Sequence, residues 1–522
     1  MSMNLTGVQR ERGPVRIVDT SIRDGNQSLW GATGITTGMA EAMAPIYEQM
    51  GLFALDFTSS THLSMGVKFH GENPWERIAR VRAAAPSTPL SCITTGMRFM
   101  SWEKAEESVY RMSLRVMARH GVNRLMIAEP GNDIAQTMKV AQWAREEGFD
   151  HVLAGVVYTT SPVHTDEKFL AATTAYATCA DIDSLYLKDP GGLLTSERTV
   201  ELVPKMRAAL GDKTFELHSH CTTGDAAHLY LVAAELGIDV LHTGMGPLSN
   251  GTAQPSLEHL LANLDALGIP VDVDRAAAAE GAALLDDFAR AQKMQAGRPG
   301  EYDLSFHLHQ VPGGMMGTLK RQLAEIGMSE ALPAVIDEAG RVRADLGYPI
   351  MVTPFSQFVG SQALMNVLAE KSGHERYSRI PDEVVKFVIG DFGSPEGEIN
   401  PEILQRVADN PRVAELKAAR RERSLEELHA EYAGKFGRQL SEEDLLLRLV
   451  LPEDQAEIAI NAAPAPKWGG SATKSSASGA STSSAPVTNV SEFIDAVNAL
   501  PTWKSLSVTR PGAQINLSRD EA

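Results

Sequence analysis

Four residues in three separated segments could together bind one metal ion. Asp24 lies in the run RDGNQS, Lys188 in the run YLKDPGGLL, and His218 and His220 in the run HSH. A protonated lysine repels a divalent cation, because its amine is cationic at its usual pKa of about 10.4. Burial that deprotonates Lys188 would let CO2 convert the amine into an anionic carbamate, which is an oxygen ligand. The four residues therefore predict a site with nitrogen and oxygen ligands.

The segments that precede these residues are short and rich in apolar and β-branched residues. They are 15–18, 184–187 and 214–217. Each candidate ligand would then sit at the carboxyl end of a strand, and alternation along an extended chain would place both imidazoles of HSH on one face. Taken singly, each has an ordinary explanation as a turn, solvated or chance residue. Their order and their places at strand ends favour a shared metal site.

Composition excludes several classes of protein. The chain has 522 residues, with 66 Asp and Glu against 48 Lys and Arg and a net charge of -18, which opposes binding to nucleic acid. Three cysteines and no export segment argue against a disulfide framework. No apolar run approaches the roughly 20 residues of a membrane span, and the N-terminus is polar. We therefore expect a cytoplasmic protein with no direct membrane span.

Eight short strand-like runs alternate with amphipathic helical stretches over the first half of the chain. This alternation predicts an α/β fold of the (β/α)8 TIM-barrel type, whose active site lies at the carboxyl ends of the strands. The runs are 15–18, 52–57, 90–94, 124–128, 151–157, 184–187, 214–217 and 240–243.

The rest of the chain loses the strand signal and divides into further regions. After about residue 270, Ala, Glu, Arg and Leu recur at helical spacing, which predicts a mainly helical C-terminal domain. A Ser/Ala-rich segment is too small and polar to build a core and is typical of a flexible linker. The tail contains an amphipathic piece, 490–500, that is either a docking peptide or a solvated helix. The predicted regions are an N-terminal extension 1–13, a TIM-barrel domain 14–300, a helical domain 301–463, a linker 464–486 and a tail 487–522.

The motif order resembles the biotin-dependent carboxyltransferase family, which implies that the barrel is a carboxyltransferase domain. Members of the family include the carboxyltransferase domain of pyruvate carboxylase, the alpha subunit of oxaloacetate decarboxylase and the metal-containing subunit of transcarboxylase. The resemblance covers roughly residues 14 to 460, and the YTTSPVHT and TPFSQFVG runs are most similar to the decarboxylase and transcarboxylase subunits. The further matching motifs are NPWER at 73–77, YTTSPVHT at 158–165, NGTAQPS at 250–256, QVPGG at 310–314 and VTP at 352–354.

The resemblance implies a ligand set and a cofactor. Asp24, carboxylated Lys188, His218 and His220 would hold a divalent metal, and the mixed ligands suit zinc, cobalt or manganese. The metal would act as a Lewis acid toward the acceptor's carbonyl group.

The resemblance also implies roles in catalysis. Thr252 matches the threonine that relays a proton between the acceptor and the ureido nitrogen of biotin, a task that suits a hydroxyl because it both donates and accepts. Arg23 and Gln27 match residues that orient the substrate and the enolate oxygen. Asp19, at the end of the first strand, is expected to support the metal ligands rather than to bind the metal itself.

The resemblance further implies partners. Relatives that carry their own biotin have about 70 residues after such a linker, with a lysine flanked by methionines, whereas about 36 residues follow it here without that motif. We expect biotin on a separate carrier protein, a separate biotin carboxylase subunit and a homodimer of this chain.

The acceptor pocket departs from the family pattern. An arginine that pairs with the substrate's carboxylate in the LLRG run is replaced by Thr95 in ITTG, a tyrosine by Trp102, and an aspartate by Ser64. Arg98, three residues beyond Thr95, is the candidate to replace the lost charge. Otherwise pyruvate should bind poorly, because charge-assisted pairs exceed ordinary hydrogen bonds, and the small-molecule acceptor is a different enolisable carbonyl or amide-like compound that is neutral and larger.

Three alternatives stay open. The first is a standard pyruvate or oxaloacetate carboxyltransferase or decarboxylase. The second is a metal-dependent carbon–carbon lyase or condensing enzyme, against which Lys188 and the QVPGG run argue. The third is a non-catalytic scaffold, which the retained metal residues and Thr252 disfavour.

Overall fold

A closed barrel of parallel strands forms the centre of the protein. The computed structural model describes residues 4–101, 104–393, 395–469, 505–510 and 513–518. Strand β1 pairs with both β2 and β8, which closes the sheet and confirms the predicted TIM barrel. The barrel strands are β1 (Val15–Asp19), β2 (Ala54–Ser59), β3 (Leu90–Thr94), β4 (Arg124–Ile127), β5 (His151–Val157), β6 (Ser184–Asp189), β7 (Thr214–Ser219) and β8 (Val240–Thr243), and a short β9 (Val271–Asp272) pairs with β1.

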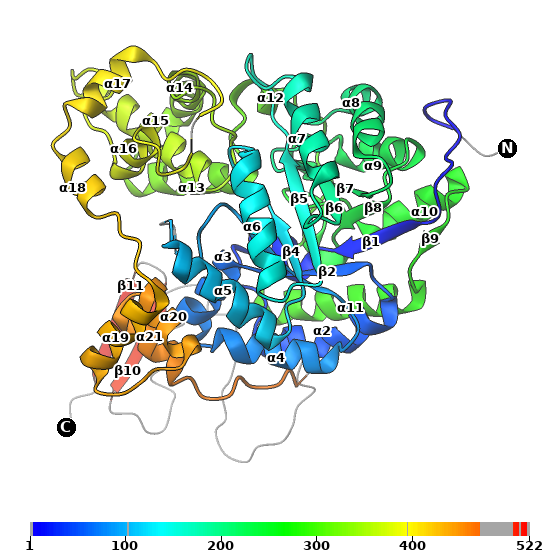
Figure 1. Ribbon diagram of the computed structural model, residues 1–522, viewed down its shortest axis with the longest axis horizontal. Coiled ribbons are helices and arrows are strands. Elements are labelled where there is room, and N and C mark those ends of the chain that lie inside the picture. Colours follow the sequence, from blue (N-terminus) through cyan, green and yellow to red (C-terminus); the bar gives the residue numbers. More distant parts are fainter. Residues whose placement is uncertain (1–3, 102–103, 394, 470–504, 511–512, 519–522) are drawn as a thin grey trace. The chain divides into compact units, whose positions relative to one another are not determined.

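Helices follow the strands and surround the barrel (Figure 1). Their termini are set by local sequence. At the start of α4, the Asn73 side chain accepts hydrogen bonds from the backbone N–H groups of Trp75 and Glu76, and Pro74 occupies the first turn. The helices of this layer are α1 (Asn26–Trp30), α2 (Thr37–Met50), α3 (Ser60–Met65), α4 (Pro74–Ala84), α5 (Glu107–His120), α6 (Ile134–Glu146), α7 (Asp166–Thr178), α8 (Ser196–Leu210), α9 (Ala226–Glu235), α10 (Leu257–Leu267) and α11 (Arg275–Gln292).

The helical region beyond the barrel has two parts. The first has its own apolar core, in which Val335, Phe358 and Phe387 are buried together. It consists of α13 (Gly313–Glu325), α14 (Leu332–Asp345), α15 (Phe355–Lys371), α16 (Asp382–Val388), α17 (Pro401–Ala408) and α18 (Arg412–Ala418), after the short α12 (Ser305–His309).

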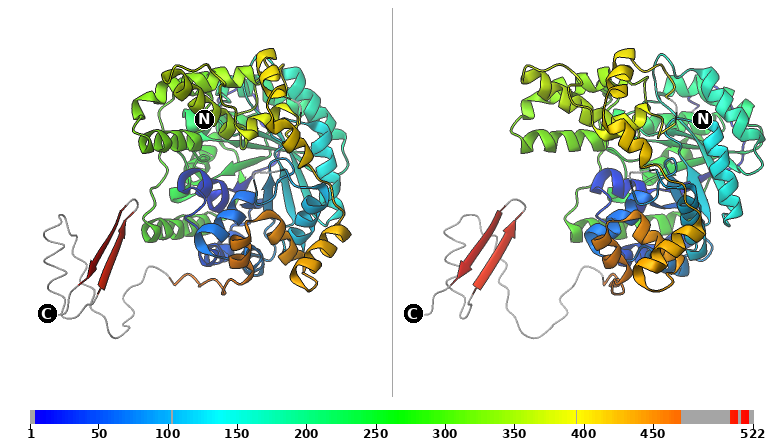
Figure 2. Two further views of the ribbon diagram at one scale, coloured as in Figure 1. Left: turned by 90° about the vertical axis from the view of Figure 1, so that its left-hand side faces the viewer. Right: turned by 60° about the vertical axis from the view of Figure 1, so that its left-hand side comes forward.

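The second part packs against the barrel layer instead. It consists of α19 (Leu425–Phe436), α20 (Glu442–Val450) and α21 (Glu453–Ile460). Leu428, Leu445 and Leu447 belong to the same apolar cluster as the barrel helices. Figure 1 shows these orange helices well separated from α14, α15, α16 and α17, and Figure 2 gives two further views of both groups. The helical region predicted over 301–463 therefore has one part with its own core and one part without.

The start of the predicted linker is packed rather than flexible. The Ala465 backbone donates to Glu76 and accepts from Arg80, and Trp468 lies edge-on against Phe288 with ring centroids 4.9 Å apart. An aromatic anchor and small neighbours let this extended segment lie on α4 and α11. The flexible linker predicted from 464 thus does not begin before 470, and the remainder of it lies outside the described residues.

The two ends of the chain differ. In the N-terminal extension, Arg10 donates to the carbonyl groups of Ala234 and Ile238, which ties the segment to the end of α9 and the turn before β8. In the tail, β10 (Ser505–Arg510) and β11 (Ala513–Ser518) form an antiparallel hairpin. The amphipathic piece at 490–500 lies outside the described residues. None of the described helices combines the length and hydropathy of a membrane span.

Candidate active site

The ends of three barrel strands bring the predicted metal ligands to one place. Asp24 lies in the short helical turn η1 (Ser21–Gly25) that follows β1. Lys188 lies near the end of β6 and is the register partner of His218 on β7. His220 follows directly after β7. Residues far apart in the sequence therefore meet at the barrel mouth, as their places after strands predict.

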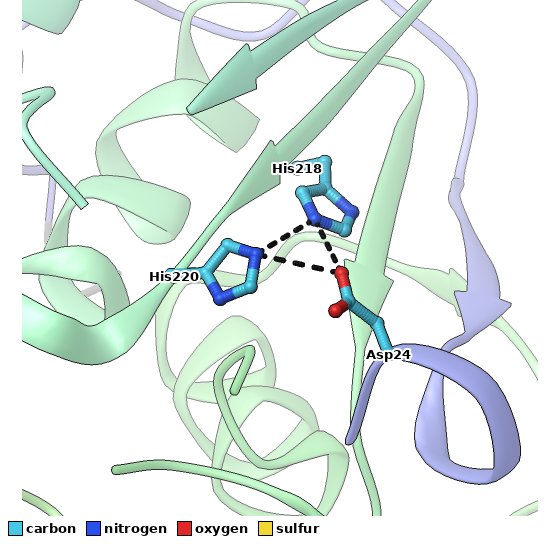
Figure 3. A group of neighbouring side chains, drawn as sticks. All are labelled: Asp24, His218 and His220. Carbon is cyan, nitrogen blue, oxygen red and sulfur yellow. Dashed lines mark hydrogen bonds and ion pairs between the residues drawn. The ribbon is translucent and has the colours of Figure 1, made fainter. Parts of the chain in front are cut away.

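The carboxylate and the two imidazoles converge on one point (Figure 3). Asp24 Oδ2 lies 2.9 Å from His218 Nε2 and 3.4 Å from His220 Nε2, and the two Nε2 atoms are 3.3 Å apart. All three side chains are buried. Burial alone would raise the pKa of Asp24, but the Arg23 guanidinium and the imidazoles hold it well below its usual range. Asp24 is therefore a carboxylate at neutral pH.

The protonation of His220 shows that this cluster suits a cation. His220 Nδ1 lies 2.7 Å from the carbonyl oxygen of Thr252, and a carbonyl can only accept, so Nδ1 carries the proton. In the neutral imidazole, the lone pair of Nε2 then points at the carboxylate of Asp24 and at His218 Nε2. Such a concentration of acceptor atoms is favourable only with positive charge between them, and carboxylate with imidazole is a common donor set for zinc and related metals.

Lys188 is buried beside this cluster. Its side chain is 4% exposed, its Nζ lies 5.8 Å from the centre of the Tyr186 ring, and it lines the same cavity as Asp24 and His220. Burial lowers the pKa of Lys188 to about 8. The amine is therefore far closer to its neutral form at pH 7 than a solvated lysine is.

Arg23 and Gln27 also line this cavity. Arg23 Nε donates to Asp56 Oδ2 at 2.8 Å, and its Nη2 lies 3.3 Å from Asp24 Oδ2. Two carboxylates therefore compensate the charge of this guanidinium. Gln27 Oε1 is buried and has no hydrogen-bond partner within the described part of the chain. Its amide is thus available to a substrate that can donate a hydrogen bond.

Thr252 faces the cavity from the turn that follows β8. Its hydroxyl donates to the carbonyl oxygen of Ser28 at 2.8 Å. Gly313, the first residue of α13, lies directly over it, because a Cβ added at Gly313 would come within 2.2 Å of Thr252 Cγ2. The glycine of the QVPGG motif thus lets the helical region approach the predicted relay residue.

The cavity has a volume of about 580 Å³ and lies between the barrel mouth and helices α13 and α15. Its charged and imidazole side chains are Arg23, Asp24, Lys188, His220 and Arg321. Its hydroxyl side chains are Ser28, Ser59, Ser60, Thr61, Thr95, Thr222, Thr252, Thr353, Ser356 and Ser361. Its apolar side chains include Met65, Ile93, Met315, Met351 and Val352. Beyond the metal-type cluster, the walls are therefore mostly neutral.

The predicted acceptor residues do not all reach this cavity. Thr95 lines it, whereas Ser64 does not, and the neighbouring Ser60 and Thr61 take that place. Arg98 is 5% exposed and does not line it; its Nη1 donates to the Thr95 carbonyl at 3.0 Å and its guanidinium lies 4.6 Å from the centre of the Phe392 ring. Trp102 lies outside the described residues.

Asp19 serves the turn that carries Asp24 rather than the cluster itself. Asp19 accepts hydrogen bonds from the backbone and hydroxyl of Ser21, and that hydroxyl accepts from the backbone of Met245. Burial raises the pKa of Asp19 to about 7. Asp19 thus supports the predicted metal loop from behind.

Sequence reasoning missed three polar residues next to the cluster. Gln254 Nε2 lies 3.2 Å from both Asp24 Oδ2 and His218 Nε2. In the sequence, only its place in the NGTAQPS motif could have indicated that it belongs to the site. Glu216 is two residues before His218, so strand alternation places it on the same inward face. His242 lies on β8 beside His218, and its sequence surroundings carry no signal.

A (β/α)8 barrel with a buried carboxylate–imidazole cluster at its mouth defines a barrel enzyme, and comparisons with known proteins identify the family. An HMGL-like family model matches residues 14–284, more than half of the chain, and a conserved carboxylase domain model matches residues 307–517. A pyruvate carboxylase subunit of Methanocaldococcus jannaschii is 34% identical over 76% of this chain and 68% of its own. The 2-oxoglutarate carboxylase large subunit of Hydrogenobacter thermophilus is 28% identical over 76% of this chain and 60% of its own.

A solved structure shows the same fold. The carboxyl transferase domain of Rhizobium etli pyruvate carboxylase superposes with a TM-score of 0.76 over 86% of this chain and 78% of that chain, at 24% identity. The chain belongs to the biotin-dependent carboxyltransferase family, as its motifs predicted, and is a carboxyltransferase subunit of that family.

Proposed function

We propose that this chain transfers a carboxyl group between carboxybiotin on a separate carrier protein and an enolisable carbonyl acceptor other than pyruvate. The observation that supports this proposal is that Asp24, Lys188, His220 and Thr252 open into one cavity whose remaining lining is neutral except for Arg23 and the exposed Arg321. The first half of the proposal follows the family, and the second follows the walls of the cavity.

Asp24, His218, His220 and carboxylated Lys188 hold a divalent metal in this proposal. The carboxylate, the imidazoles and a carbamate oxygen suit zinc, cobalt or manganese. When bound, the metal polarises the acceptor's carbonyl group as a Lewis acid. Carboxylation of Lys188 replaces a cation in the cluster by an anion, which removes the repulsion that an ammonium group would exert.

Thr252 moves the proton. Carboxybiotin loses CO2, its ureido nitrogen takes the hydroxyl proton of Thr252, and Thr252 Oγ1 takes the proton that the acceptor loses next to its carbonyl. The resulting enolate carbon forms a bond to CO2, so that atoms and charge balance. For this step the hydroxyl hydrogen of Thr252 must turn away from the carbonyl oxygen of Ser28. Rotation about the Cβ–Oγ1 bond of Thr252 allows this. Arg23 and Gln27 orient the acceptor.

The cavity walls favour an acceptor that is neutral at the end away from its carbonyl. Two carboxylates engage Arg23, while Arg321 is an exposed residue 3.9 Å from Glu325. Thr95 stands where the family's arginine is expected, and Arg98 packs on Phe392 instead. A substrate carboxylate would lose its hydration there in exchange for contacts with neutral hydroxyl and amide groups, at a cost of several kcal/mol.

The names of the relatives support the proposal that biotin and the biotin carboxylase are on separate chains. Both are named as single subunits of a carboxylase, and their names give different acceptors, pyruvate and 2-oxoglutarate. Membership of the family thus leaves the acceptor open. We propose that a biotin carboxyl carrier protein and a biotin carboxylase are the partners of this chain, which forms a homodimer.

A second candidate is the standard reaction with pyruvate or oxaloacetate. The observation in its favour is the 34% identity with one chain of a pyruvate carboxylase. It requires a cation that enters the cavity when substrate binds.

One experiment separates the two candidates. A carrier protein charged with labelled carboxybiotin is mixed with the metal-loaded chain and with pyruvate, oxaloacetate, 2-oxoglutarate or neutral ketones and amides. We expect label transfer to a neutral acceptor, and loss of transfer after removal of the metal with a chelator. Preferred transfer to pyruvate would establish the second candidate. If the chain carried a full complement of metal and still transferred the label to no acceptor, both candidates would be overturned.

A further inference from the structure

A line of buried polar groups crosses the barrel interior beneath His218. Arg124 Nη2 lies 2.6 and 2.7 Å from the two carboxylate oxygens of Glu216. Glu216 Oε2 lies 2.9 Å from His242 Nε2, and His242 Nδ1 lies 3.2 Å from His218 Nδ1. Each of the four side chains is at most 1% exposed. Barrel interiors are ordinarily filled by branched apolar residues, so four polar ones in contact require an explanation.

The donors and acceptors along this line can be assigned from one end. Glu216, held by the guanidinium of Arg124, is a carboxylate and can only accept, so His242 Nε2 carries a proton. A neutral His242 then has a lone pair at Nδ1, which accepts from His218 Nδ1–H. The remaining nitrogen of His218, Nε2, therefore presents its lone pair to the Asp24 and His220 cluster. The opposite tautomer of His218 would leave two lone pairs face to face at 3.2 Å unless His242 carried both protons.

We propose that Glu216 and His242 are positioning residues that keep the proton of His218 on Nδ1 and so make its Nε2 a metal ligand. The inference rests on the metal site of the proposed function. It concerns the strength of metal binding, because groups that orient a ligating histidine typically contribute a factor of about 10 to 100 in metal affinity. Arg124 belongs to the line as the counter-charge of Glu216.

Packing holds both rings in the planes that these hydrogen bonds need. The Tyr186 ring stacks on His242 with centroids 5.9 Å apart and an interplanar angle of 10°, and it meets His218 edge-on at 82°. Tyr186 is the register partner of Glu216 on the neighbouring strand. These ring contacts favour the orientations in which the two imidazoles are observed.

Variants of His242 test the proposal through zinc affinity. The full chain is stripped with a chelator, and Zn²⁺ binding is measured by competition with a chelating dye. His242→Phe keeps a ring under Tyr186 but cannot accept from His218, so we expect zinc affinity about 10- to 100-fold weaker. His242→Asn supplies an oxygen near the place of Nδ1 and should stay close to wild type.

His164→Phe is the matched control. It removes another buried histidine, which bonds through Nδ1 to Ser161 at 2.7 Å and whose charged neighbours are Arg343 and Lys168 rather than residues of the buried line. We expect normal zinc affinity for it. Equal affinities of wild type and His242→Phe, or equal losses in His242→Phe and His242→Asn, would overturn the proposal.

A direct measurement covers the case in which His242→Phe does not fold. Nitrogen-15 NMR of the zinc-loaded wild-type chain, labelled at histidine, reports which ring nitrogen of each histidine carries the proton. We expect His218 to be protonated at Nδ1 and bound to zinc at Nε2, and the reverse would overturn the inference. If wild type binds no zinc, the metal site itself fails; if wild type binds zinc and His242→Phe binds it equally, only this inference fails.

Discussion

The floor and the walls of the cavity are built from different chemistry. At the floor, Asp24, Lys188 and His220 are buried and charged or metal-binding in type, and Gln254 and the Thr252 carbonyl hold Asp24 and His220 in place. On the wall, Thr95, Ser60 and Met351 offer hydroxyl and apolar contacts. The floor carries the residue types of the proposed metal site and proton relay, whereas Thr95 stands on the wall where the family resemblance predicts an arginine. We therefore propose that the groups that carry the reaction and the groups that select the acceptor are separate in this protein.

The largest effect should come from removing the lysine at the floor. Lys188→Ala deletes one ligand, so we expect the chain to lose nearly all bound metal and all carboxyl transfer. Metal analysis after dialysis measures the first and the carboxybiotin assay the second. Lys205→Ala, on the outer surface of α8, is the control and should keep both. Normal metal content in Lys188→Ala would end the carbamate proposal.

The proton relay should give the next largest effect. Thr252→Ala removes the hydroxyl but no ligand, so transfer should fall by about 100- to 10,000-fold, the usual range for a general acid–base group, while metal content stays normal. Thr252→Ser keeps the hydroxyl and should retain most activity. Near-normal transfer by Thr252→Ala would show that another group moves the proton.

A positive charge added to the cavity wall should raise kcat/KM for pyruvate. Thr95→Arg restores the cation of the family pattern, and a charge-assisted hydrogen bond of about 1.5 to 3 kcal/mol corresponds to a gain of roughly 10- to 150-fold in kcat/KM for pyruvate. Thr95→Gln adds length without charge and should give little gain. Steady-state kinetics measure both variants. Efficient use of pyruvate by the unaltered chain, with a KM below about 1 mM, would contradict the neutral-acceptor proposal.

The smallest effect on catalysis should come from Arg98. Because this guanidinium packs on Phe392 outside the cavity, Arg98→Met should change kcat/KM for the acceptor little. The free energy of unfolding should fall by about 1 to 3 kcal/mol, since a buried hydrogen-bonded charge is removed. Thermal unfolding measures the change in stability, and steady-state kinetics measure the change in kcat/KM. A large rise in KM with unchanged stability would place Arg98 in contact with the acceptor.

Much of the fold was predictable because it depends on local patterns. All eight predicted strand runs overlap barrel strands, with ends that differ by up to two residues, since strand alternation and short apolar runs reflect residues that are close in sequence. The packed segment at 464–469 was not predictable from its composition. Its order depends on Trp468 meeting Phe288 and on Ala465 meeting Glu76, which are distant in the chain.

The sequence by itself determined the barrel and the strand-end places of Asp24, Lys188, His218 and His220, because these residues lie at or just after the ends of β1, β6 and β7. Only the tertiary structure decided which other polar groups reach them. Glu216 and His242 come from β7 and β8, and Arg124 comes from β4 on the opposite side of the barrel. Barrel closure brings these side chains together in the interior, and such contacts between distant strands leave no periodic signal in the chain.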